Sequence, residues 1–400
     1  MLEQPMSKAG WTRVAFGDVV RLSKARVADP EAAGIERFVG LEHIEPGDLR
    51  IRRWGDVADG TTFTTLFKPG QVLFGKRRAY QRKVAVADFE GVCSGDIYVL
   101  EPANDRLMPE LLPFLCQTDA FFDHAVGTSA GSLSPRTNWT SLASFEFLLP
   151  PIQEQARLVE AFLSFDNACE ALRELSNKSR DLLFSTSTEL LHQHNLLKLT
   201  PTSTLPAPGW RNVAFNDVCE RITYGFTNPM PTTDAGPWMV TAKDVVDGII
   251  DYTSARHTRR DAFETELTEK SRVRIGDVLL TKDGTLGRVA VVDRDDVCIN
   301  QSVAVLRPND RSDGVFLSKV LRAPQMQARL MKDSGGSAVK HLYITKVGET
   351  RFFLPSIEEQ ARISGILNSL EERVNASEKR LSELNSLKKS ILEGEVHHAL

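Results

Sequence analysis

The chain has 400 residues, of which 42% are hydrophobic and 26% are charged, and its formal net charge is −4. These ordinary globular values exclude a disordered or fibrous protein, and the length predicts two or three domains. The slight acidity excludes a uniformly basic nucleic-acid binder, so any affinity for DNA must come from local patches or from partner subunits.

The five cysteines are scattered, odd in number and without a C-x-x-C spacing. Such usage is typical of reduced thiols in a cytoplasm and not of a disulfide framework or a zinc site. The histidine pairs at 192/194 and 397/398 lack cysteine or acidic partners at ligand spacing, so we expect surface side chains and no metal site. No segment approaches the roughly 18 apolar residues that a membrane span needs. The sequence therefore predicts a cytoplasmic protein without membrane contact.

Three segments of the first half of the chain recur in the second half, at offsets of 199, 206 and 205 residues. This period far exceeds the roughly 20–50 residues of solenoid repeats, so each copy is predicted to be a whole domain followed by its own connector. The recurring segments are GWTRVAFGDVVRL at 10–22 and GWRNVAFNDVCER at 209–221, KPGQVLFGKRRAYQRKVAVAD at 68–88 and RIGDVLLTKDGTLGRVAVVD at 274–293, and FLLPPIQEQARL at 147–158 and FFLPSIEEQARI at 352–363.

Within each copy the sequence predicts a hairpin-rich sheet followed by one helix. Short β-branched runs bounded by Gly, Asp and Pro are typical of strands. They lie at 72–74, 83–89 and 96–102 in the first copy and at 278–282, 288–293 and 302–308 in the second. Residues 108–125 and 314–331 predict one helix per copy. A Gly/Ser-rich loop follows each helix, at 127–139 and at 334–346.

After Pro151 and Pro355 the apolar period becomes helical and predicts long helices at 152–197 and about 357–393, the second somewhat shorter. On each helix the apolar positions are spaced alternately by four and three residues and form a narrow seam, which requires a partner helix. The predicted fold class is α+β, with two duplicated mixed α/β domains separated and followed by long helices that pair as an antiparallel coiled coil with pseudo-two-fold symmetry. The seam positions are Leu158, Phe162, Phe165, Cys169, Leu172, Ser176, Ser179 and Leu183, and Ile363, Leu367, Leu370, Val374, Ser377, Leu381, Leu384 and Ile391.

A domain that ends in LPPIQEQARL or LPSIEEQARI, continues into a long helix and occurs twice resembles the DNA-specificity subunit of type I restriction–modification systems. The PGQVLF and IGDVLL strands, the Gly/Ser loops and the segments TYGFTNPMP and WMVTAKDV carry the same resemblance. It implies target recognition domains at 1–150 and 199–354, and conserved helical regions at 151–198 and 355–400.

The resemblance also implies a bipartite, asymmetric site on double-stranded DNA as the target. The implied partners are two modification (methyltransferase) subunits and up to two restriction (motor and nuclease) subunits. This chain is then expected to bind no cofactor, with S-adenosylmethionine on the modification subunits and ATP and Mg on the restriction subunits.

Candidate DNA contacts fall in the basic run, the Gly/Ser loops and the early part of the second copy. Lys and Arg neutralise phosphate, Arg and Gln pair with base edges, and small hydroxyl residues allow close backbone approach. Thr227, Asn228 and Lys243 rest mainly on the resemblance. The full set is Lys76, Arg77, Arg78, Tyr80, Gln81, Arg82, Lys83, Ser129, Ser132, Arg136, Thr227, Asn228, Lys243, Lys282, Thr285, Arg288, Ser337 and Lys340.

Two other functional classes compete with this interpretation. A free-standing DNA-binding or adaptor protein would reuse the same duplicated scaffold without a methyltransferase. An enzyme is disfavoured because GQVLFGK at 70–76 continues with Arg77 where a nucleotide-binding loop needs Ser or Thr, and because no methyl-transfer motif is present. The recurring Glu154-Gln155 and Glu359-Gln360 predict a shared role, either in docking a partner or in holding each domain to its helix.

Overall fold

The computed structural model of the chain describes residues 10–191, 209–246, 248–335 and 340–397, with side chains as far as Gly394 in the last range. Ser337 and the histidines at 192, 194 and 398 therefore lie outside the described residues, as does the side chain of His397. The chain forms two compact units, one made of Met1–Arg173 with Glu378–Leu400 and the other of Glu174–Ser377.

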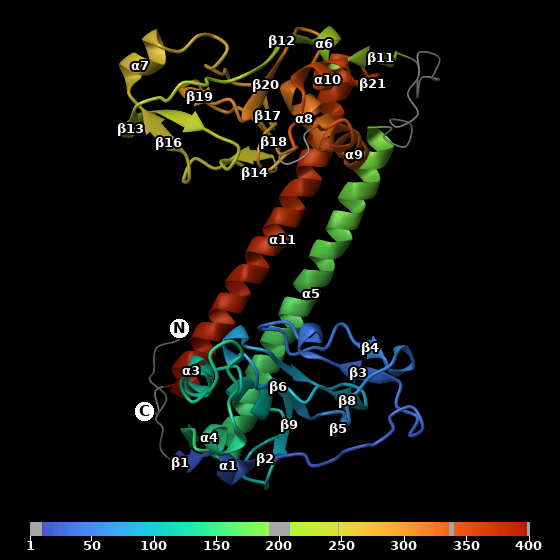
Figure 1. Cartoon of the computed structure of the whole chain (residues 1–400), viewed down its shortest axis with the longest axis vertical. Coiled ribbons are helices and arrows are strands. Elements are labelled where there is room, and N and C mark those ends of the chain that lie inside the picture. Colours follow the sequence, from blue (N-terminus) through green and yellow to red (C-terminus); the bar gives the residue numbers. More distant parts are fainter. Residues whose placement is uncertain (1–9, 192–208, 247, 336–339, 398–400) are drawn as a thin grey trace. The chain divides into compact units, whose positions relative to one another are not determined.

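The described residues of the first unit form ten short strands and four short helices before the first long helix. Figure 1 shows how these elements are arranged. Three 3-10 turns, η1 (Leu41–His43), η2 (Val57–Asp59) and η3 (Ala79–Gln81), lie between strands. The helices are α1 (Phe16–Val19), α2 (Leu112–Leu115), α3 (Asp119–Gly127) and α4 (Trp139–Ala143). The strands are β1 (Thr12–Ala15), β2 (Val20–Leu22), β3 (Arg37–Val39), β4 (Gly55–Asp56), β5 (Thr65–Phe67), β6 (Val72–Gly75), β7 (Val84–Val86), β8 (Gly91–Cys93), β9 (Ile97–Pro102) and β10 (Glu146–Leu149).

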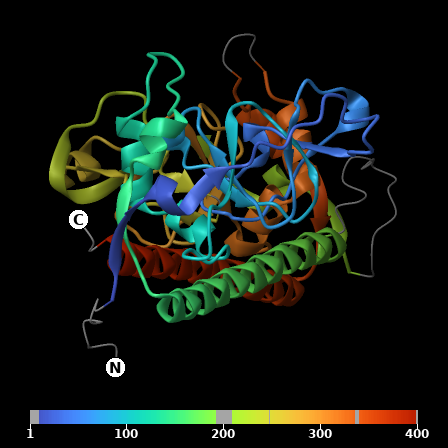
Figure 2. The same ribbon diagram turned by 90° about the horizontal axis from the view of Figure 1, so that it is seen from below.

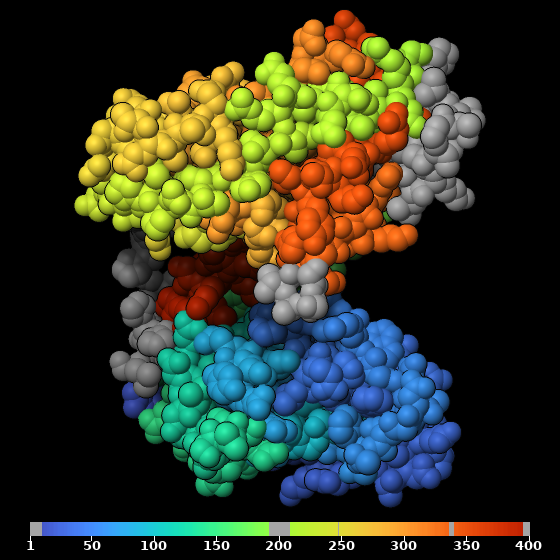
Figure 3. Space-filling view, turned by 45° about the horizontal axis from the view of Figure 1, so that its top comes forward, coloured from blue at the N-terminus to red at the C-terminus, as the bar shows by residue number. Residues whose placement is uncertain are grey.

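A central sheet in the order β2-β9-β6-β7 separates two hydrophobic cores of the first unit. Successive side chains of a strand point to opposite faces, and accordingly Val72 and Phe74 enter one core while Leu73 enters the other. A second sheet, β4-β3-β8-β5, contributes Val39, Phe67 and Cys93 to the smaller core. In the space-filling view, the part of this unit that precedes the long helix, coloured blue to green, forms one closely packed body (Figure 3).

The second unit repeats this plan, with a central sheet in the order β12-β20-β17-β18. Val278 and Leu280 again enter one core, and Leu279 enters the other. A small hairpin, β14–β15, is added in this copy. Its helices are α6 (Phe215–Val218), α7 (Arg260–Thr265), α8 (Gly314–Arg322), α9 (Pro324–Lys332) and α10 (Ile344–Glu349). Its strands are β11 (Arg211–Ala214), β12 (Cys219–Tyr224), β13 (Thr232–Val240), β14 (Val245–Val246), β15 (Ile249–Ile250), β16 (Arg256–Thr258), β17 (Val278–Thr281), β18 (Val289–Val291), β19 (Val297–Ile299), β20 (Val303–Pro308) and β21 (Arg351–Leu354).

The strands predicted from the β-branched runs are confirmed, whereas the prediction of one helix per copy is wrong. In the first copy α2 ends before Thr118, whose extended backbone starts α3 and whose side chain accepts a hydrogen bond from the Phe121 N–H. In the second copy the break falls at Ala323, which is extended because Pro324 follows it. Each predicted helix is therefore a pair of short helices.

Two long helices follow the domains, α5 (Ile152–Leu190) and α11 (Ile357–His397). Residues 192–197 of the first predicted helix lie outside the described residues. With 41 residues against 39, α11 is not the shorter helix, contrary to expectation. All sixteen predicted seam positions are buried or half-buried.

The long helices lie side by side and run antiparallel in both units (Figures 1 and 2). In the first unit an early residue of α5, Asp166, accepts a hydrogen bond from Lys388 near the end of α11, at 2.5 Å. In the second unit the order is reversed, because Leu183 and Leu190 of α5 pack with Ile363 and Leu367 near the start of α11. No helix among the described residues is long and apolar enough to cross a membrane.

A buried glutamine fastens each domain to the first turn of its long helix. Gln155 accepts a hydrogen bond from the Met108 N–H at 2.8 Å and donates to the carbonyls of Arg106 and Pro150. Gln360 makes the same three bonds, with the Asp313 N–H and the carbonyls of Arg311 and Pro355. The adjacent Glu154 and Glu359 instead pair with arginines three residues later. Of the two predicted roles, the glutamines therefore hold domain to helix.

Candidate nucleic-acid interface

The basic run at 76–83 connects β6 to β7 through a tight turn. Arg78 and Arg82 flank η3, and both have a left-handed backbone, with φ of 54° and 55°. Residues other than glycine rarely adopt this conformation. Cations that are neighbours in this turn therefore reach different surroundings.

The Gly/Ser-rich loop folds back on itself and packs against this turn. Ala130 and Arg136 exchange both backbone hydrogen bonds, each 3.0 Å long, and so close a small hairpin. The hydroxyl oxygen of Ser134 accepts hydrogen bonds from Arg77 at 3.0 Å and from Arg78 at 3.1 Å. The structure thus brings together two groups of candidates that lie about 55 residues apart in the sequence.

Asp96 is the carboxylate on which this cluster converges. It accepts hydrogen bonds from Arg77 at 3.1 Å and from Arg136 at 2.8 Å. Burial alone would raise the pKa of Asp96, but the hydrogen bonds from Arg136 and Arg77 outweigh burial and lower it. Asp96 therefore stays ionised at neutral pH and fixes the loop against the turn.

Arg82 and Lys83 are half-buried and contact other parts of the first unit. The Arg82 guanidinium pairs with Asp119, donates to the Gln117 carbonyl at 3.3 Å and lies 4.6 Å above the ring of Phe122. The Lys83 ammonium donates to the Leu41 carbonyl at 2.6 Å. Both cations therefore have internal partners before any DNA approaches.

The remaining candidates of the first unit lie at or near the surface. Tyr80 is 55% exposed, Gln81 is half-buried in the turn, and Ser132 is exposed. The Ser129 hydroxyl donates to the Ala125 carbonyl at 2.7 Å, which caps the end of α3. Tyr80 and Ser132 are thus the members of this group with the most accessible side chains.

Lys76 and Lys282 occupy equivalent positions at the ends of β6 and β17. The Lys76 N–H donates to the Asp96 carbonyl, and its own carbonyl accepts from the Thr137 N–H, both at 3.0 Å. Lys282 makes the same two backbone bonds with Ser302 and Leu342, both at 2.9 Å. Each unit therefore clamps this lysine between a hairpin turn and the end of its Gly/Ser loop.

The two ammonium groups differ in their partners. Lys76 lies 4.5 Å above the ring of Tyr98, and burial lowers its pKa. Lys282 lies 5.2 Å above the ring of Tyr224 but also pairs with Asp283 at 2.5 Å. The second lysine is neutralised within its own unit, and the first is not paired with a carboxylate among the described residues.

The other candidates of the second unit are spread over several loops. The Arg288 guanidinium donates to the Val245 carbonyl at 3.4 Å, and the Lys243 ammonium donates to the Ser254 carbonyl at 3.2 Å. Four other candidates have exposed side chains. They are Thr227 and Asn228 after β12, Thr285 after β17, and Lys340 before α10. Ser337 lies outside the described residues.

A cavity of about 350 Å³ in the first unit contains Lys76 together with residues that sequence reasoning missed. Arg26, which follows β2, and Thr64, which precedes β5, reach it from segments without a recognisable motif. The available signal was the cation Arg26 itself, but nothing in the sequence indicates that its loop folds beside the end of β6.

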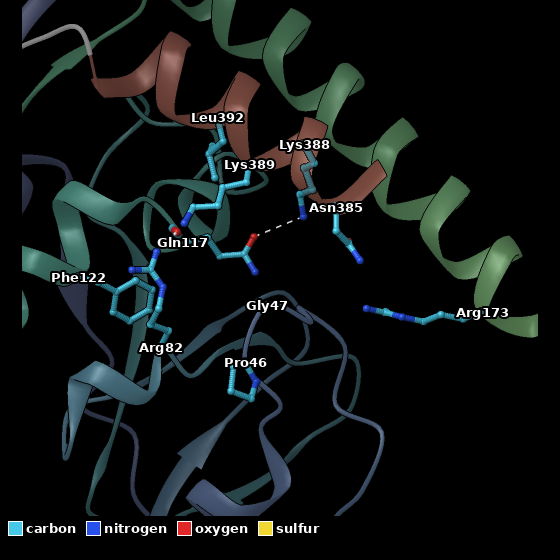
Figure 4. Close-up of a pocket in the computed structure, with 10 residues that line it drawn as sticks. All are labelled: Pro46, Gly47, Arg82, Gln117, Phe122, Arg173, Asn385, Lys388, Lys389 and Leu392. Atoms are coloured by element: carbon cyan, nitrogen blue, oxygen red, sulfur yellow. Dashed lines mark hydrogen bonds between the residues drawn. The ribbon is translucent and has the colours of Figure 1, made fainter. Parts of the chain in front are cut away.

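A second cation-rich cavity, of about 330 Å³, lies where α5, α11 and the loop at Pro46 meet in the first unit (Figure 4). Its four cations all have carboxylate partners. Lys388 pairs with Asp166 at 2.5 Å, Arg173 pairs with Asp48 at 3.0 Å, and Arg82 and Lys389 share Asp119. The pairs of Arg173 and Lys389 connect the long helices to the domain, and the pair of Lys388 connects the two helices to each other, so the charges at this cavity are structural.

The family model for the type I restriction modification DNA specificity domain matches residues 10–178 and again residues 209–386. The specificity subunit of the type I restriction enzyme EcoBI from Escherichia coli is 26% identical over 382 residues, which cover 86% of this chain and 78% of that protein. The EcoDI specificity subunit, also from Escherichia coli, is 30% identical over 191 residues, covering 45% of this chain and 42% of that protein.

Solved structures share the fold over nearly the whole chain. A type I restriction–modification S subunit from M. genitalium aligns with a TM-score of 0.60 at 14% identity, covering 98% of this chain and 97% of the other. A chain from a study of complex assembly and conformational transition of a type I R-M system aligns with a TM-score of 0.57 at 21% identity, covering 96% and 97%. At these identities the likeness shows the fold alone.

Proposed function

Because the chain belongs to the family defined by the type I restriction–modification DNA specificity domain, which it carries twice, we propose that it is the specificity subunit of such a system. It reads a bipartite, asymmetric site on double-stranded DNA, with one half-site for each domain. Reading two half-sites with two different domains accounts for the duplication and for the divergence of the two basic turns.

The observation that carries this proposal is the lysine clamp that both units build. In each, a strand of the central sheet ends in a lysine held between a hairpin turn and the Gly/Ser loop, and the surrounding turns supply arginines and hydroxyls. Contacts from such side chains and from loop amides position DNA through its phosphates, and base edges are read from the same loops. We assign the eighteen candidate residues to this interface, with the lysine clamps at its centre.

The proposed partners are two modification subunits and up to two restriction subunits. The long helices supply suitable surface, because each begins with an exposed isoleucine, Ile152 and Ile357, in a turn that is equivalent in the two copies. Apolar side chains repeated on two equivalent helices suit two copies of one partner. We place the assembled complex in the cytoplasm.

We propose further that this chain carries no catalytic chemistry and binds no cofactor of its own. The segment that resembles a nucleotide-binding loop forms the buried strand β6, followed by η3 instead of the helix N-terminus that cradles phosphates. S-adenosylmethionine belongs in this proposal to the modification subunits, which methylate a flipped adenine, and ATP and Mg belong to the restriction subunits.

Methylome sequencing of cells with and without the gene tests the proposal. We expect a split adenine motif that disappears with the gene, and the absence of any such motif would contradict the proposed function. The alternative, a free-standing DNA-binding adaptor, predicts instead that no modification subunit co-purifies with the chain. Co-purification at two modification subunits per chain would exclude that alternative.

A further inference from the structure

The cavity around Lys76 differs from the other charged sites of the first unit in having cations without carboxylates. No acidic residue lines it, and its polar lining consists of Ser23, Arg26, Thr62, Thr64, Thr65, Lys76 and Tyr98. By contrast, the four cations at the cavity between the long helices and the domain are all paired.

Lys76 is held in this cavity at an electrostatic cost. Its ammonium is half-buried over the ring of Tyr98, and loss of hydration lowers its pKa. Asp96 attracts it from a distance, but the carboxylate oxygens of Asp96 are already engaged by Arg77 and Arg136. Arg26 adds like-charge repulsion to Lys76 and has no ion-pair partner among the described residues. Lost hydration destabilises the half-buried Lys76 ammonium, which has no paired carboxylate, and an anionic ligand would offset that loss.

The position of Arg26 is set by the backbone. Arg26 forms an antiparallel bridge with Thr65, and the flanking backbone bonds, Val27 N–H to the Thr64 carbonyl and Leu66 N–H to the Ala25 carbonyl, measure 2.9 and 3.1 Å. The hydroxyls at Thr62 and Thr64 are on the same segment and line the same cavity. Two cations and several hydroxyl donors thus reach one space from four separate segments.

We propose that this cavity binds a phosphate group of the DNA half-site read by the first domain, with Lys76 and Arg26 as its charged ligands. The inference rests on the proposed function and adds Arg26 and the threonines to its interface. Charge-assisted hydrogen bonds from Lys and Arg are the strongest that a phosphate oxygen accepts in proteins. In the second unit the equivalent Lys282 is instead neutralised by Asp283 at 2.5 Å.

The test uses the complete complex with its modification subunits and a duplex carrying the motif found by methylome sequencing. Lys76→Met keeps an aliphatic side chain beside the Tyr98 ring and removes the positive charge. Arg26→Met likewise replaces a cation by an uncharged side chain. The log–log salt slope of DNA binding should fall by about one for each lost phosphate contact. Lys68→Met, at the opposite end of β6, should leave the slope unchanged.

Gly95→Asp gives an independent charge reversal at the same place. Gly95 lines the cavity, and a Cβ added there meets no atom within 4 Å, so the backbone has room for a side chain at this position. It should weaken DNA binding by about tenfold at low salt, which is the size of one lost charged contact. Thermal unfolding of each variant shows whether the first unit is intact.

A methylphosphonate scan of the duplex identifies the phosphate. At one position in the first half-site, the neutral linkage should weaken DNA binding by the wild type. At that position the wild type and Lys76→Met should then bind the duplex with equal affinity. Equal salt slopes for all variants would overturn the proposal, as would an altered base preference in Lys76→Met. If inorganic phosphate stabilises the wild type but not Lys76→Met while the DNA slope is unchanged, the cavity holds a free oxyanion and the DNA assignment is wrong. Absence of any methylated motif would instead defeat the proposed function itself.

Discussion

Gln155 and Gln360 each satisfy one backbone N–H and two carbonyls at the start of a long helix, and both are almost completely buried. A carboxylate offers no donor, so Gln155→Glu leaves two carbonyls unpaired and adds repulsion between oxygens. We expect the free energy of unfolding of the first unit to fall by roughly 1–3 kcal/mol for each carbonyl that loses its hydrogen-bond donor. Urea unfolding of the wild type and variant measures this loss.

Gln360→Glu should destabilise the second unit in the same way, and Glu154→Gln is the matched control because Glu154 pairs only with Arg157 on the helix surface. If Gln155→Glu unfolds at the same urea concentration as Glu154→Gln, the glutamine does not hold the domain to the helix.

Asp96 offers a second test at the residue scale. Asp96→Asn removes a negative charge from the proposed DNA surface, which by simple electrostatics would strengthen DNA binding. We expect weaker binding instead, because Arg77 and Arg136 lose the acceptor that fixes the Gly/Ser loop. Hydrogen exchange at the Ala130 and Arg136 amides should speed up in the variant, and tighter DNA binding with unchanged exchange would contradict the assignment.

The pH dependence of this effect follows from the lowered pKa of Asp96. A carboxylate with a depressed pKa in the folded state stabilises the protein above its ordinary value of 3.8 and loses that contribution as the pH falls through the folded value. The stability difference between wild type and Asp96→Asn should therefore be constant at neutral pH and shrink below about pH 4.

At this scale the sequence identifies the candidates but does not separate their roles. Lys76 and Arg82 belong to one basic run, yet Arg82 pairs with Asp119 while Lys76 has no carboxylate partner among the described residues. The difference arises from the left-handed backbone at Arg78 and Arg82 and from acids that lie far away in the sequence. Neither is visible in the composition of the run.

Among the elements, α8 is connected to α11 by a cluster of partly buried charges. Glu371 accepts hydrogen bonds from Lys319 at 2.7 Å and from Arg322 at 3.0 Å. Lys319 is only 6% exposed, and burial lowers its pKa despite the carboxylate. Removing one member of a buried pair costs more than replacing both, since the remaining charge has no partner.

We therefore expect Glu371→Gln to destabilise the second unit by about 3 kcal/mol. The double variant Lys319→Met/Glu371→Gln should recover much of this loss, because the uncompensated ammonium is gone. A double-mutant cycle from urea unfolding measures the coupling. Additive effects of the two single substitutions would show that the pair contributes no interaction energy.

Element type is where the sequence is most informative. Runs such as Val278–Thr281 form strands because they are apolar on both faces, and the sheet they build is buried on both faces. In the second copy, Pro324 indicates the break between the two domain helices, because proline cannot continue a helix from the preceding turn. The helical spacing of the apolar residues on both sides obscures this signal. In the first copy the break depends on capping by Thr118, a weaker signal that periodicity overrides.

For the whole molecule, the long helices carry several large apolar side chains that are exposed to solvent. Exposed apolar residues on α5 and α11 include Ile152, Leu163, Leu175, Leu182, Phe184, Ile357, Ile366 and Leu387. Large exposed apolar patches mark interaction surfaces or aggregation sites. We expect the chain expressed alone to self-associate and to bind DNA poorly, and the chain co-expressed with its modification subunits to be monodisperse.

Substitutions on α5 distinguish a specific interaction surface from non-specific association. Leu182 and Phe184 are 50% and 55% exposed on α5, so changing both to Gln should not affect folding. Self-association, measured by light scattering during size-exclusion chromatography, should decrease in the double variant, whereas Lys178→Gln on the same helix should leave it unchanged. If the proposed partners cover these two side chains, the double variant should also bind modification subunits more weakly. A wild-type chain that is monodisperse alone and binds its motif tightly would contradict this prediction and favour the free-standing adaptor.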